Sequence, residues 1–254
     1  MLRSVRRLAG VAALAVVLVI PATAQASHSW GGYHWARTSN PFTVKLGDNV
    51  TGAWDGYLMT TSSDWSQSTV LDTTIVAGGS PRPKQCRPTT GRVEVCNATY
   101  GNNGWLGVAG ISITGGTHIT QAYVKLNDTY FNTAQYNTPA WRNMVMCQEV
   151  GHALGLDHQD EAFDNPNLGT CMDYTNDPST NQHPNKHDYD QLEAIYAHLD
   201  SSSTIGAAVP KGGGAASASS AFGRLVSSSA NGKVQTFVRD LGGGRLEVTH
   251  VIWA

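Results

Sequence analysis

Residues 148–158 read QEVGHALGLDH, and the spacing of their polar side chains predicts a metal site. Gln148 and His152 are one helical turn apart, so both side chains project from the same face of a helix. Gly155 lets the chain leave the helix with backbone angles that other residues disfavour, and His158 then returns as a third ligand. Three protein ligands leave one position of a zinc ion open for water, as in catalytic zinc sites.

Glu149 supplies the second part of the predicted chemistry. It directly follows the first ligand position, so its carboxylate is placed to take a proton from a zinc-bound water. In well-studied sites zinc lowers the pKa of this water to about 7, which makes a nucleophile available at neutral pH. Gln148 can offer its amide oxygen, which zinc accepts, although imidazole is the better donor. The alternative interpretation is an ordinary amphipathic helix that carries stray histidines.

Residues 171–174, with the sequence CMDY, follow a short way downstream and are similar to a Met-turn. Together with residues 148–158 they resemble the metzincin clan of secreted zinc endopeptidases, which includes matrixins and astacins. The chain follows the pattern H-E-x-x-H-x-x-G-x-x-H at every fixed position except the first, where Gln148 stands for His. The resemblance covers residues 42–199. It implies an α+β fold with a twisted, mostly parallel five-stranded sheet, an active-site helix and a Met-turn beneath the metal.

The resemblance also implies a role for each matching residue. These are the general base Glu149, the zinc ligands Gln148, His152 and His158, the helix-ending Gly155, and Met172 beneath the metal. Tyr174 occupies the position at which astacins and serralysins carry a Tyr that approaches zinc or stabilises the oxyanion. The predicted helix at residues 185–199 is similar to the closing helix of matrixins.

The predicted elements follow one another as in an α+β domain. Strands are predicted at residues 42–46, 70–76, 106–113 and 119–126. The stretch from Gly79 to Gly104 is predicted to be rich in loops. A first helix is expected after Asp48 as its cap, with Val50, Trp54, Leu58, Thr61 and Trp65 on one face. Thr138 and Pro139 open the motif helix as N-cap and first helical residue.

Both ends of the chain read as segments outside the domain, which is expected at residues 27–200. Residues 1–26 show the basic start, apolar run and small residues of a signal peptide, which predicts export. The apolar run is shorter than a membrane-spanning helix needs. Residues 201–230 are rich in Ser, Gly and Ala, which is typical of a linker. Residues 231–254 have the pattern of a β-hairpin, and a lone hairpin is marginal in water, so we expect it to dock.

Charge limits the partners that the chain can have. The sequence holds 17 basic and 19 acidic residues, a formal charge of -2. The predicted signal peptide contains three arginines and no acids, so the remainder has 14 basic and 19 acidic residues, a charge of -5. No basic cluster is present, which argues against nucleic acid or an anionic membrane as a partner. We expect a monomer that acts on an extracellular protein or peptide.

The four cysteines fit an oxidising compartment and allow three pairings. Cys86 and Cys96 flank a loop that contains Pro and Arg, so a local bridge is the natural choice. That leaves Cys147 with Cys171, and such a bridge would join the motif helix to the predicted Met-turn. The alternative is a pair of free buried thiols.

Other candidate ligands lie near the motif or elsewhere in the chain. Four acidic residues follow the motif closely: Asp160, Glu161, Asp164 and Asp173. Carboxylates of this kind bind calcium, but a solvated acidic loop is the favoured interpretation. His118, His183 and His187 are candidate replacements for the missing His, although an ordinary surface or capping histidine is favoured for each.

Three hypotheses for function follow. The first is a secreted zinc-dependent endopeptidase in which a zinc-activated water attacks a peptide carbonyl and Glu149 is the general base. Its substrate would lie extended along an edge strand near residues 115–126. The second is a catalytically weak or inactive metzincin that serves as an extracellular binding module, motivated by Gln148. The third is a structural role in which the hairpin mediates assembly.

Overall fold

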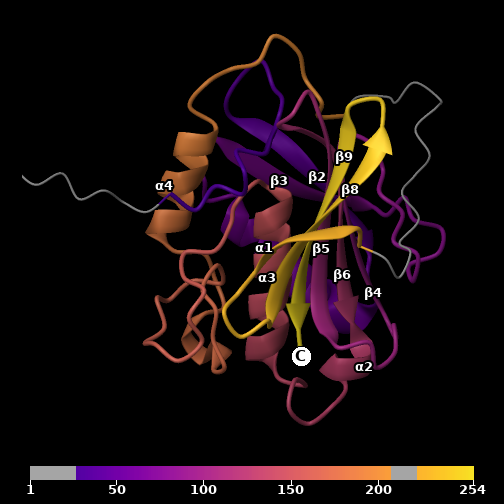
Figure 1. Ribbon diagram of the computed structural model, residues 1–254, viewed down its shortest axis with the longest axis vertical. Coiled ribbons are helices and arrows are strands. Elements are labelled where there is room, and N and C mark those ends of the chain that lie inside the picture. Colours follow the sequence, from indigo (N-terminus) through magenta and orange to yellow (C-terminus); the bar gives the residue numbers. More distant parts are fainter. Residues whose placement is uncertain (1–26, 207–221) are drawn as a thin grey trace, which may run out of the picture.

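The computed structural model describes residues 27–206 and 222–254. The predicted signal peptide, residues 1–26, lies outside the described residues, and so does the middle of the predicted linker, residues 207–221. The described parts contain one large mixed sheet with helices packed against it (Figure 1). This agrees with the predicted combination of a mostly parallel sheet and few helices.

Nine strands and four α-helices make up the described part of the chain. The strands are β1 (His34–Trp35), β2 (Phe42–Asn49), β3 (Leu71–Ala77), β4 (Val93–Ala98), β5 (Trp105–Thr114), β6 (His118–Asn127), β7 (Arg224–Ser228), β8 (Val234–Gly242) and β9 (Arg245–Trp253). The helices are α1 (Gly52–Trp65), α2 (Asp128–Phe131), α3 (Pro139–Ala153) and α4 (Lys186–Ile195), with a 3₁₀ turn at Pro178–Thr180. Strands β2, β3, β4 and β6 pair in parallel and β5 pairs antiparallel to β6, which gives the mostly parallel five-stranded sheet that was predicted.

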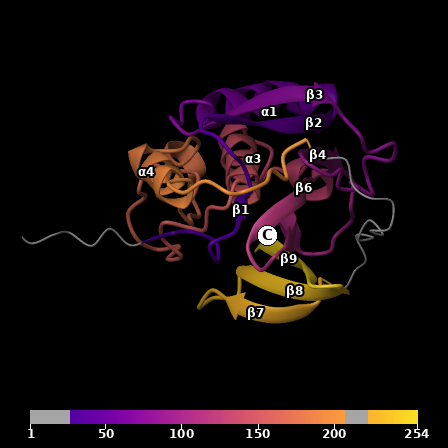
Figure 2. The ribbon, with the colours of Figure 1, turned by 90° about the horizontal axis from the view of Figure 1, so that it is seen from above.

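The tail of the chain extends this sheet by three antiparallel strands. The strand order is β3-β2-β4-β6-β5-β9-β8-β7, and β1 pairs with β6. β9 runs along β5 from the Trp105–Trp253 pair to the Ile113–Leu246 pair. Figures 1 and 2 show the tail strands, in yellow, beside β5. The expected hairpin at residues 231–254 is thus part of a larger unit that docks on the domain.

Two predictions about this region need correction. The segment expected to be linker, residues 201–230, contains strand β7, whose Ser-rich sequence hides a strand that pairs with β8. The edge strand expected near residues 115–126 is not an edge, because β6 lies between β4 and β5, and β9 covers the far side of β5. The strand path ends at β3 and β7 instead.

Helices α1 and α3 pack against each other on one face of the sheet (Figure 2). The face of α1 that was predicted to be apolar is buried at Trp54, Leu58, Thr61 and Trp65. The cap of α1 is Thr51 and not Asp48, because β2 extends through Asp48, whose side chain accepts a hydrogen bond from the Val50 amide.

Helix α3 begins as the sequence predicts. The Thr138 hydroxyl accepts a hydrogen bond from the Trp141 amide, and Pro139 takes the first helical position. Helix α4 is shorter than the predicted 185–199 because it ends at Ile195, although Asn185 caps it together with Asp188.

Strand β4 lies in a stretch that the sequence predicts as loop. Its Glu94 is fully buried and is paired with Arg92, whose Nη2 lies 2.6 Å from the carboxylate. The Asn49 amide donates a further hydrogen bond to Glu94 at 2.6 Å. A buried carboxylate interrupts the apolar pattern of a strand; its ion-pair partner Arg92 is local, and its hydrogen-bond donor Asn49 comes from another strand.

Both expected disulfides are present, Cys86–Cys96 and Cys147–Cys171, and the described residues contain no free cysteine. The second bridge joins α3 to the segment that carries Met172. No helix within residues 27–206 and 222–254 has the length and apolar character needed to cross a membrane.

Candidate metal centre

The turn after α3 brings His158 back toward the helix, as the sequence predicts. Gly155 adopts a φ of 100°, a conformation that favours glycine. A side chain there would also collide with the chain that crosses the turn, because a Cβ atom would lie 2.3 Å from the Tyr33 carbonyl oxygen. The Trp30 amide donates a hydrogen bond to the Gly155 carbonyl at 2.9 Å, which fixes the turn to the N-terminal segment.

His152 and His158 each have one ring nitrogen engaged and one free. Nδ1 of His152 lies 2.8 Å from the Leu156 carbonyl oxygen, so Nδ1 carries the proton and Nε2 has a lone pair. Nδ1 of His158 lies 2.8 Å from the Tyr174 hydroxyl and 3.2 Å from Oδ1 of Asp157. Nε2 of both rings is buried without a hydrogen-bond partner. Histidines that bind metals typically donate their other N–H group to a carbonyl or a carboxylate in this way.

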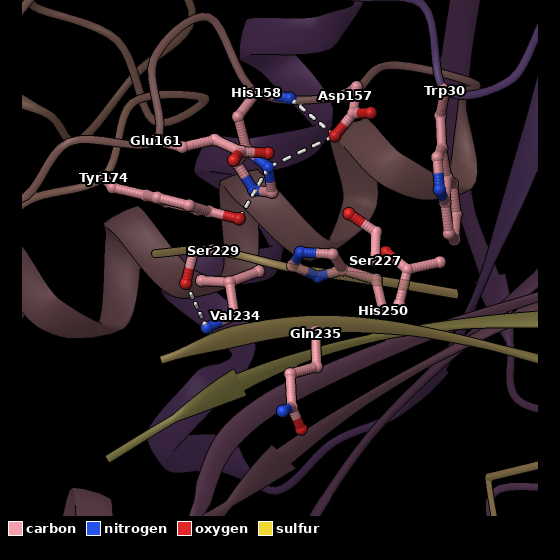
Figure 3. Close-up of a pocket in the computed structure, with 11 residues that line it drawn as sticks. Trp30, Asp157, His158, Glu161, Tyr174, Ser227, Ser229, Val234, Gln235 and His250 are labelled. Carbon is pink, nitrogen blue, oxygen red and sulfur yellow. Dashed lines mark hydrogen bonds and ion pairs between the residues drawn. The ribbon is translucent and has the colours of Figure 1, made fainter. Parts of the chain in front are cut away.

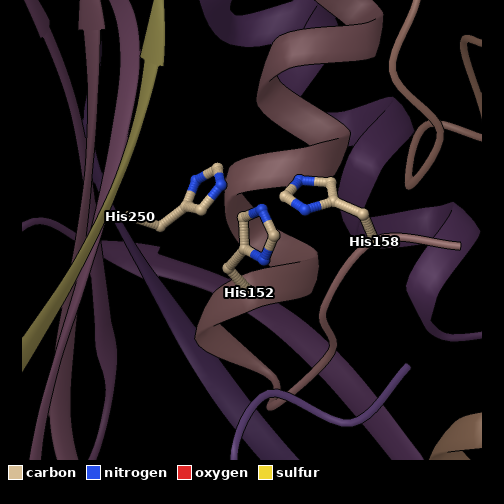
Figure 4. A group of neighbouring side chains, drawn as sticks. All are labelled: His152, His158 and His250. Atoms are coloured by element: carbon tan, nitrogen blue, oxygen red, sulfur yellow. The ribbon is translucent and has the colours of Figure 1, made fainter. Parts of the chain in front are cut away.

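A third histidine, which the sequence analysis did not consider, completes the group. His250 comes from β9 of the tail, and its ring centroid lies 3.9 Å from that of His152 and 4.7 Å from that of His158. Each of the three residues offers a ring nitrogen within 4.8 Å of those of the other two. Figure 4 shows the three rings gathered between β9, α3 and the turn that follows α3.

The alternation of β9 explains why His250 faces the motif helix. Successive side chains of a strand point to opposite faces, so Val248, His250 and Ile252 share one face. Val248 and Ile252 belong to the main core, together with Val145 of α3. The opposite face places Val251 in a smaller core with the Cys86–Cys96 bridge. The tail is therefore packed on both faces, which orients His250.

Glu149 lies beside this histidine group and is fully buried. Its Oε2 atom is 3.7 Å from Nδ1 of His250, and neither carboxylate oxygen has a hydrogen-bond partner. Burial raises the pKa of Glu149 well above the ordinary value of a glutamate. The carboxylate fits under β5 because Gly107 has no side chain: a Cβ atom there would lie 2.5 Å from Oε1 of Glu149.

Gln148 is also fully buried, and neither atom of its amide group has a hydrogen-bond partner. It lines a pocket with a volume of ≈ 110 Å³. The other residues that line this pocket include Leu106, Trp141, Met144, Tyr174 and Trp253. A buried amide without partners costs free energy, so this side chain has unused capacity for a ligand, a water or a metal.

Tyr174 and Met172 take positions that the sequence did not fully anticipate. The Tyr174 hydroxyl contacts Nδ1 of His158, so it supports the ring and is not free toward a substrate in this structure. Met172 lies against α3, where a Cβ atom on Gly151 would come within 2.6 Å of its Sδ atom. The Met172 carbonyl accepts a hydrogen bond from the Gln159 amide, which ties it to the segment after His158.

Burial favours the neutral form of two of the three histidines. Burial, together with the neighbouring His158, lowers the pKa of His152 to about 3. Burial also lowers the pKa of His250 well below its ordinary value, with His152 and His158 adding to the effect. Neutral imidazole is the form that binds a metal ion, so His152 and His250 are in the ligating state across the neutral pH range.

A small pocket opens beside the group. Its volume is ≈ 110 Å³, and His158, His250, Tyr174, Trp30 and Asp157 line it together with Glu161 and residues of β7 and β8. Figure 3 shows His158 and Tyr174 on one side of the pocket, with His250, Ser229, Val234 and Gln235 on the other. The pocket gives a small molecule or an extended chain a route toward the histidine group.

Two of the four acidic residues after the motif, Asp160 and Asp173, are used in hydrogen bonds near their own loop, whereas Glu161 lines the pocket beside His158. Both carboxylate oxygens of Asp160 accept hydrogen bonds, from the Ala162 amide and from the Asn165 side chain. Oδ2 of Asp173 accepts hydrogen bonds from the Leu168 amide and the Asn181 side chain. This loop therefore satisfies three of these four oxygens without a cation.

The histidines considered as replacements lie in other surroundings. His118 contacts Asp200, His183 contacts Asp64, and the ring of His187 stacks on that of His28. The signal that points to His250 is a polar residue on the apolar side of an alternating strand. The sequence does not reveal which surface that side covers.

Neither a scan against models of protein families nor a search of curated proteins found a match. Among solved structures the chain is similar to high choriolytic enzyme 1 (HCE-1), a hatching enzyme zinc-protease from Oryzias latipes (medaka fish). The TM-score is 0.36 and the identity 10%, over 65% of this chain and 94% of that chain. A likeness at this TM-score carries no weight for function, so the histidine group stands on its own geometry.

Proposed function

We propose that this protein is an exported zinc-dependent peptidase. The observation that carries the proposal is a group of three buried histidines beside the carboxylate of Glu149, which lies on helix α3 and has no hydrogen-bond partner. Two disulfides in the described residues support an oxidising location.

The residues present fit zinc. His152 and His158 each have Nδ1 engaged and Nε2 free, and both ring nitrogens of His250 are free. Three imidazole ligands with one open position form a catalytic zinc site. In this proposal His152, His158 and His250 hold the metal, and the tail supplies the ligand that the motif lacks at Gln148. The amide oxygen of Gln148 is the alternative third donor, and the experiment below separates the two.

Zinc at this position would act as a Lewis acid, lowering the pKa of a bound water and polarising a peptide carbonyl. The remaining steps belong to the chain itself. Glu149 accepts a proton from the attacking water and passes it to the leaving amine. Burial raises the pKa of Glu149, which strengthens the hold of this carboxylate on a proton that it takes up. Tyr174 acts through His158 by holding its ring in one orientation.

The substrate would enter through the pocket lined by His158 and His250 and not along β5. In this fold the backbone groups of β5 that a peptide would pair with are bonded to β9. On the wall of the pocket Thr236 offers a hydroxyl and Gln235 an amide nitrogen to a peptide backbone, whereas the Ser229 hydroxyl is used within its own turn.

A metal-binding recognition module is the second candidate function, and one observation favours it. His152, Glu149 and Gln148 are fully buried beneath the tail strand, so the centre is more enclosed than the cleft of an endopeptidase would be. Such a module would keep zinc but would not need Glu149, because ligand recognition does not require a general base.

The test compares zinc content and hydrolysis of a quenched peptide library in purified protein. We expect about one zinc at this centre and chelator-sensitive hydrolysis. Glu149→Gln should keep the zinc and lose hydrolysis by at least about 100-fold. If Glu149→Gln cleaves as fast as wild type, the peptidase assignment is wrong. If wild type holds zinc but cleaves nothing, the recognition module is supported.

The third ligand is identified by a matched pair of variants. His250→Ala should lose zinc at this centre, whereas Gln148→Ala should retain it. The reverse outcome would assign the position to Gln148. His183→Ala serves as the control, since this exposed histidine contacts Asp64 and lies outside the proposed ligand set.

A further inference from the structure

A second group of histidines lies around the Asp200 carboxylate. His34 belongs to β1, and His118 is the first residue of β6. His198 and Asp200 follow α4. These residues come from three separate parts of the chain, and none of them belongs to the motif at residues 148–158.

The distances within this group match the ligands of one metal ion. Nε2 of His34 lies 3.2 Å from Nε2 of His198, and the two atoms lie 3.6 and 3.8 Å from Oδ1 of Asp200. Two ligand atoms of a tetrahedral zinc ion are separated by roughly 3.3 Å, given metal–ligand bonds of about 2.0–2.1 Å. The three atoms thus form a triangle of nearly the size that zinc requires.

His118 contacts the same oxygen but lies outside the triangle formed by His34, His198 and Asp200. Its Nε2 atom lies 3.2 Å from Oδ1 of Asp200, and its ring centroid lies 5.0 Å from that of His34. Three imidazole nitrogens therefore converge on one carboxylate oxygen. A hydrogen bond to Asp200 would account for one of these contacts. It does not explain why all three rings direct Nε2 toward the same carboxylate oxygen.

The other polar atoms of the group leave the converging atoms free. Nδ1 of His34 lies 2.9 Å from the Gly32 carbonyl oxygen, so Nδ1 carries the proton and Nε2 has a lone pair. Oδ2 of Asp200 accepts hydrogen bonds from the Arg37 guanidinium at 3.0 Å and from the Arg37 amide at 3.2 Å. Oδ1 is then left for the side that faces the histidines. Metal ligands in proteins are typically held in this way, by hydrogen bonds to the polar atoms that do not face the metal.

We propose that His34, His198 and Asp200 form a second metal site that binds zinc, with His118 beside it. Three protein ligands of nitrogen and oxygen leave one position of a tetrahedral zinc ion for a water. The ion would fasten the N-terminal segment to the chain that leaves α4. The side chains of His118 and His198 are 32% and 52% exposed, which gives zinc and chelators direct access.

The experiment measures zinc content and thermal stability of the purified full chain. With both centres occupied we expect about two zinc ions per chain, and about one in His198→Ala. The His198 side chain is 52% exposed, so this variant should fold. His183→Ala is the control and should keep the wild-type content. If His198→Ala keeps the wild-type content, the second site is wrong.

Thermal unfolding and a background variant separate this site from the first centre. In His152→Ala, which removes a ligand of the first centre only, zinc should still bind and raise the unfolding temperature of metal-free protein. Adding His198→Ala to that background should abolish both effects. If the first centre does not bind zinc, wild type should hold about one ion, which His198→Ala removes. If zinc neither binds nor stabilises His152→Ala, the second site is also overturned.

Discussion

Nδ1 of His250 lies 3.7 Å from Oε2 of Glu149, although one residue belongs to the tail and the other to the motif helix. The contact exists because β9 pairs with β5 and turns Val248, His250 and Ile252 toward α3. In the proposed centre the same histidine binds zinc and neighbours the general base. The chemistry proposed for the motif therefore depends on the docking of the tail.

Replacing Gly107 should damage the centre without touching a proposed ligand. A Cβ atom at this position would lie 2.5 Å from Oε1 of Glu149 and 2.7 Å from Cγ1 of Val145. Gly107→Ala should therefore destabilise the fold by about 1–3 kcal/mol, as overpacking does, and should lower hydrolysis by displacing Glu149. Urea unfolding and peptide hydrolysis measure the two effects.

Gly56→Ala is the matched control for this substitution. Gly56 lies within α1, and a Cβ atom there would meet nothing within 4 Å. Alanine is favoured over glycine inside a helix by roughly 0.5–1 kcal/mol, so this variant should be slightly more stable and fully active. Equal stability of Gly107→Ala and Gly56→Ala would show that α3 does not approach β5 as closely as described.

The lowered pKa of Lys125 predicts how the free energy of unfolding changes with pH. Burial lowers its pKa to about 8 in the folded chain, although Glu247 of β9 opposes this effect. Between pH 8 and the ordinary lysine value the unfolded chain binds more protons than the folded one. The free energy of unfolding should therefore rise with pH across this window, by at most roughly 3 kcal/mol from this residue.

Denaturant unfolding between about pH 8 and pH 9.5 measures this dependence. Lys125→Met removes the titrating group while keeping an unbranched side chain against Tyr100 and Tyr123, whose rings the ammonium group now faces. The rise with pH should be much smaller in the variant. An identical pH dependence in both proteins would contradict the assignment of a depressed pKa to Lys125.

Removing the Cys147–Cys171 bridge should loosen the centre as well as the fold. The bridge closes a loop with a sequence separation of 24, which corresponds to about 3 kcal/mol in the chain-entropy account. It also ties α3 to the segment of Met172 and Tyr174, and Tyr174 supports the ring of His158. The double Cys→Ala variant should unfold at lower urea and bind zinc more weakly in a chelator competition.

The Cys86–Cys96 bridge provides the comparison. It lies in the smaller core beneath Val251, on the side of the sheet away from the histidine group. Its removal should reduce stability but leave zinc affinity at the first centre within about 10-fold of wild type. Equal losses of zinc affinity in both double variants would mean that global stability, and not the position of the bridge, controls the centre.

The motif helix could be predicted because its determinants are local. The cap at Thr138, the first-turn Pro139 and the positive φ of Gly155 all act within a few residues. The positions of His152 and His158 follow from that helix and turn. The pairing of the cysteines could also be predicted, because four cysteines allow only three combinations.

The features that could not be predicted from the sequence depend on contacts between segments that are distant along the chain. Strand β4 was missed because it contains the buried Glu94, which receives a hydrogen bond from Asn49 of the distant strand β2. His250 was missed because alternation shows which side of a strand is apolar but not which surface that side covers. The group around Asp200 is hidden for the same reason, as its members are scattered along the sequence.

Because β9 pairs with β5 and carries a proposed zinc ligand, the concentration of zinc should affect the solubility of the protein. A ligand that binds only the docked tail stabilises docking, by about 2.7 kcal/mol at a free concentration 100 times the dissociation constant. Loss of zinc would remove this contribution and favour release of the tail. β5 would then present a long edge with unpaired backbone groups, which is a template for association with other chains. Zinc depletion should therefore promote association of the protein through the exposed edge of β5.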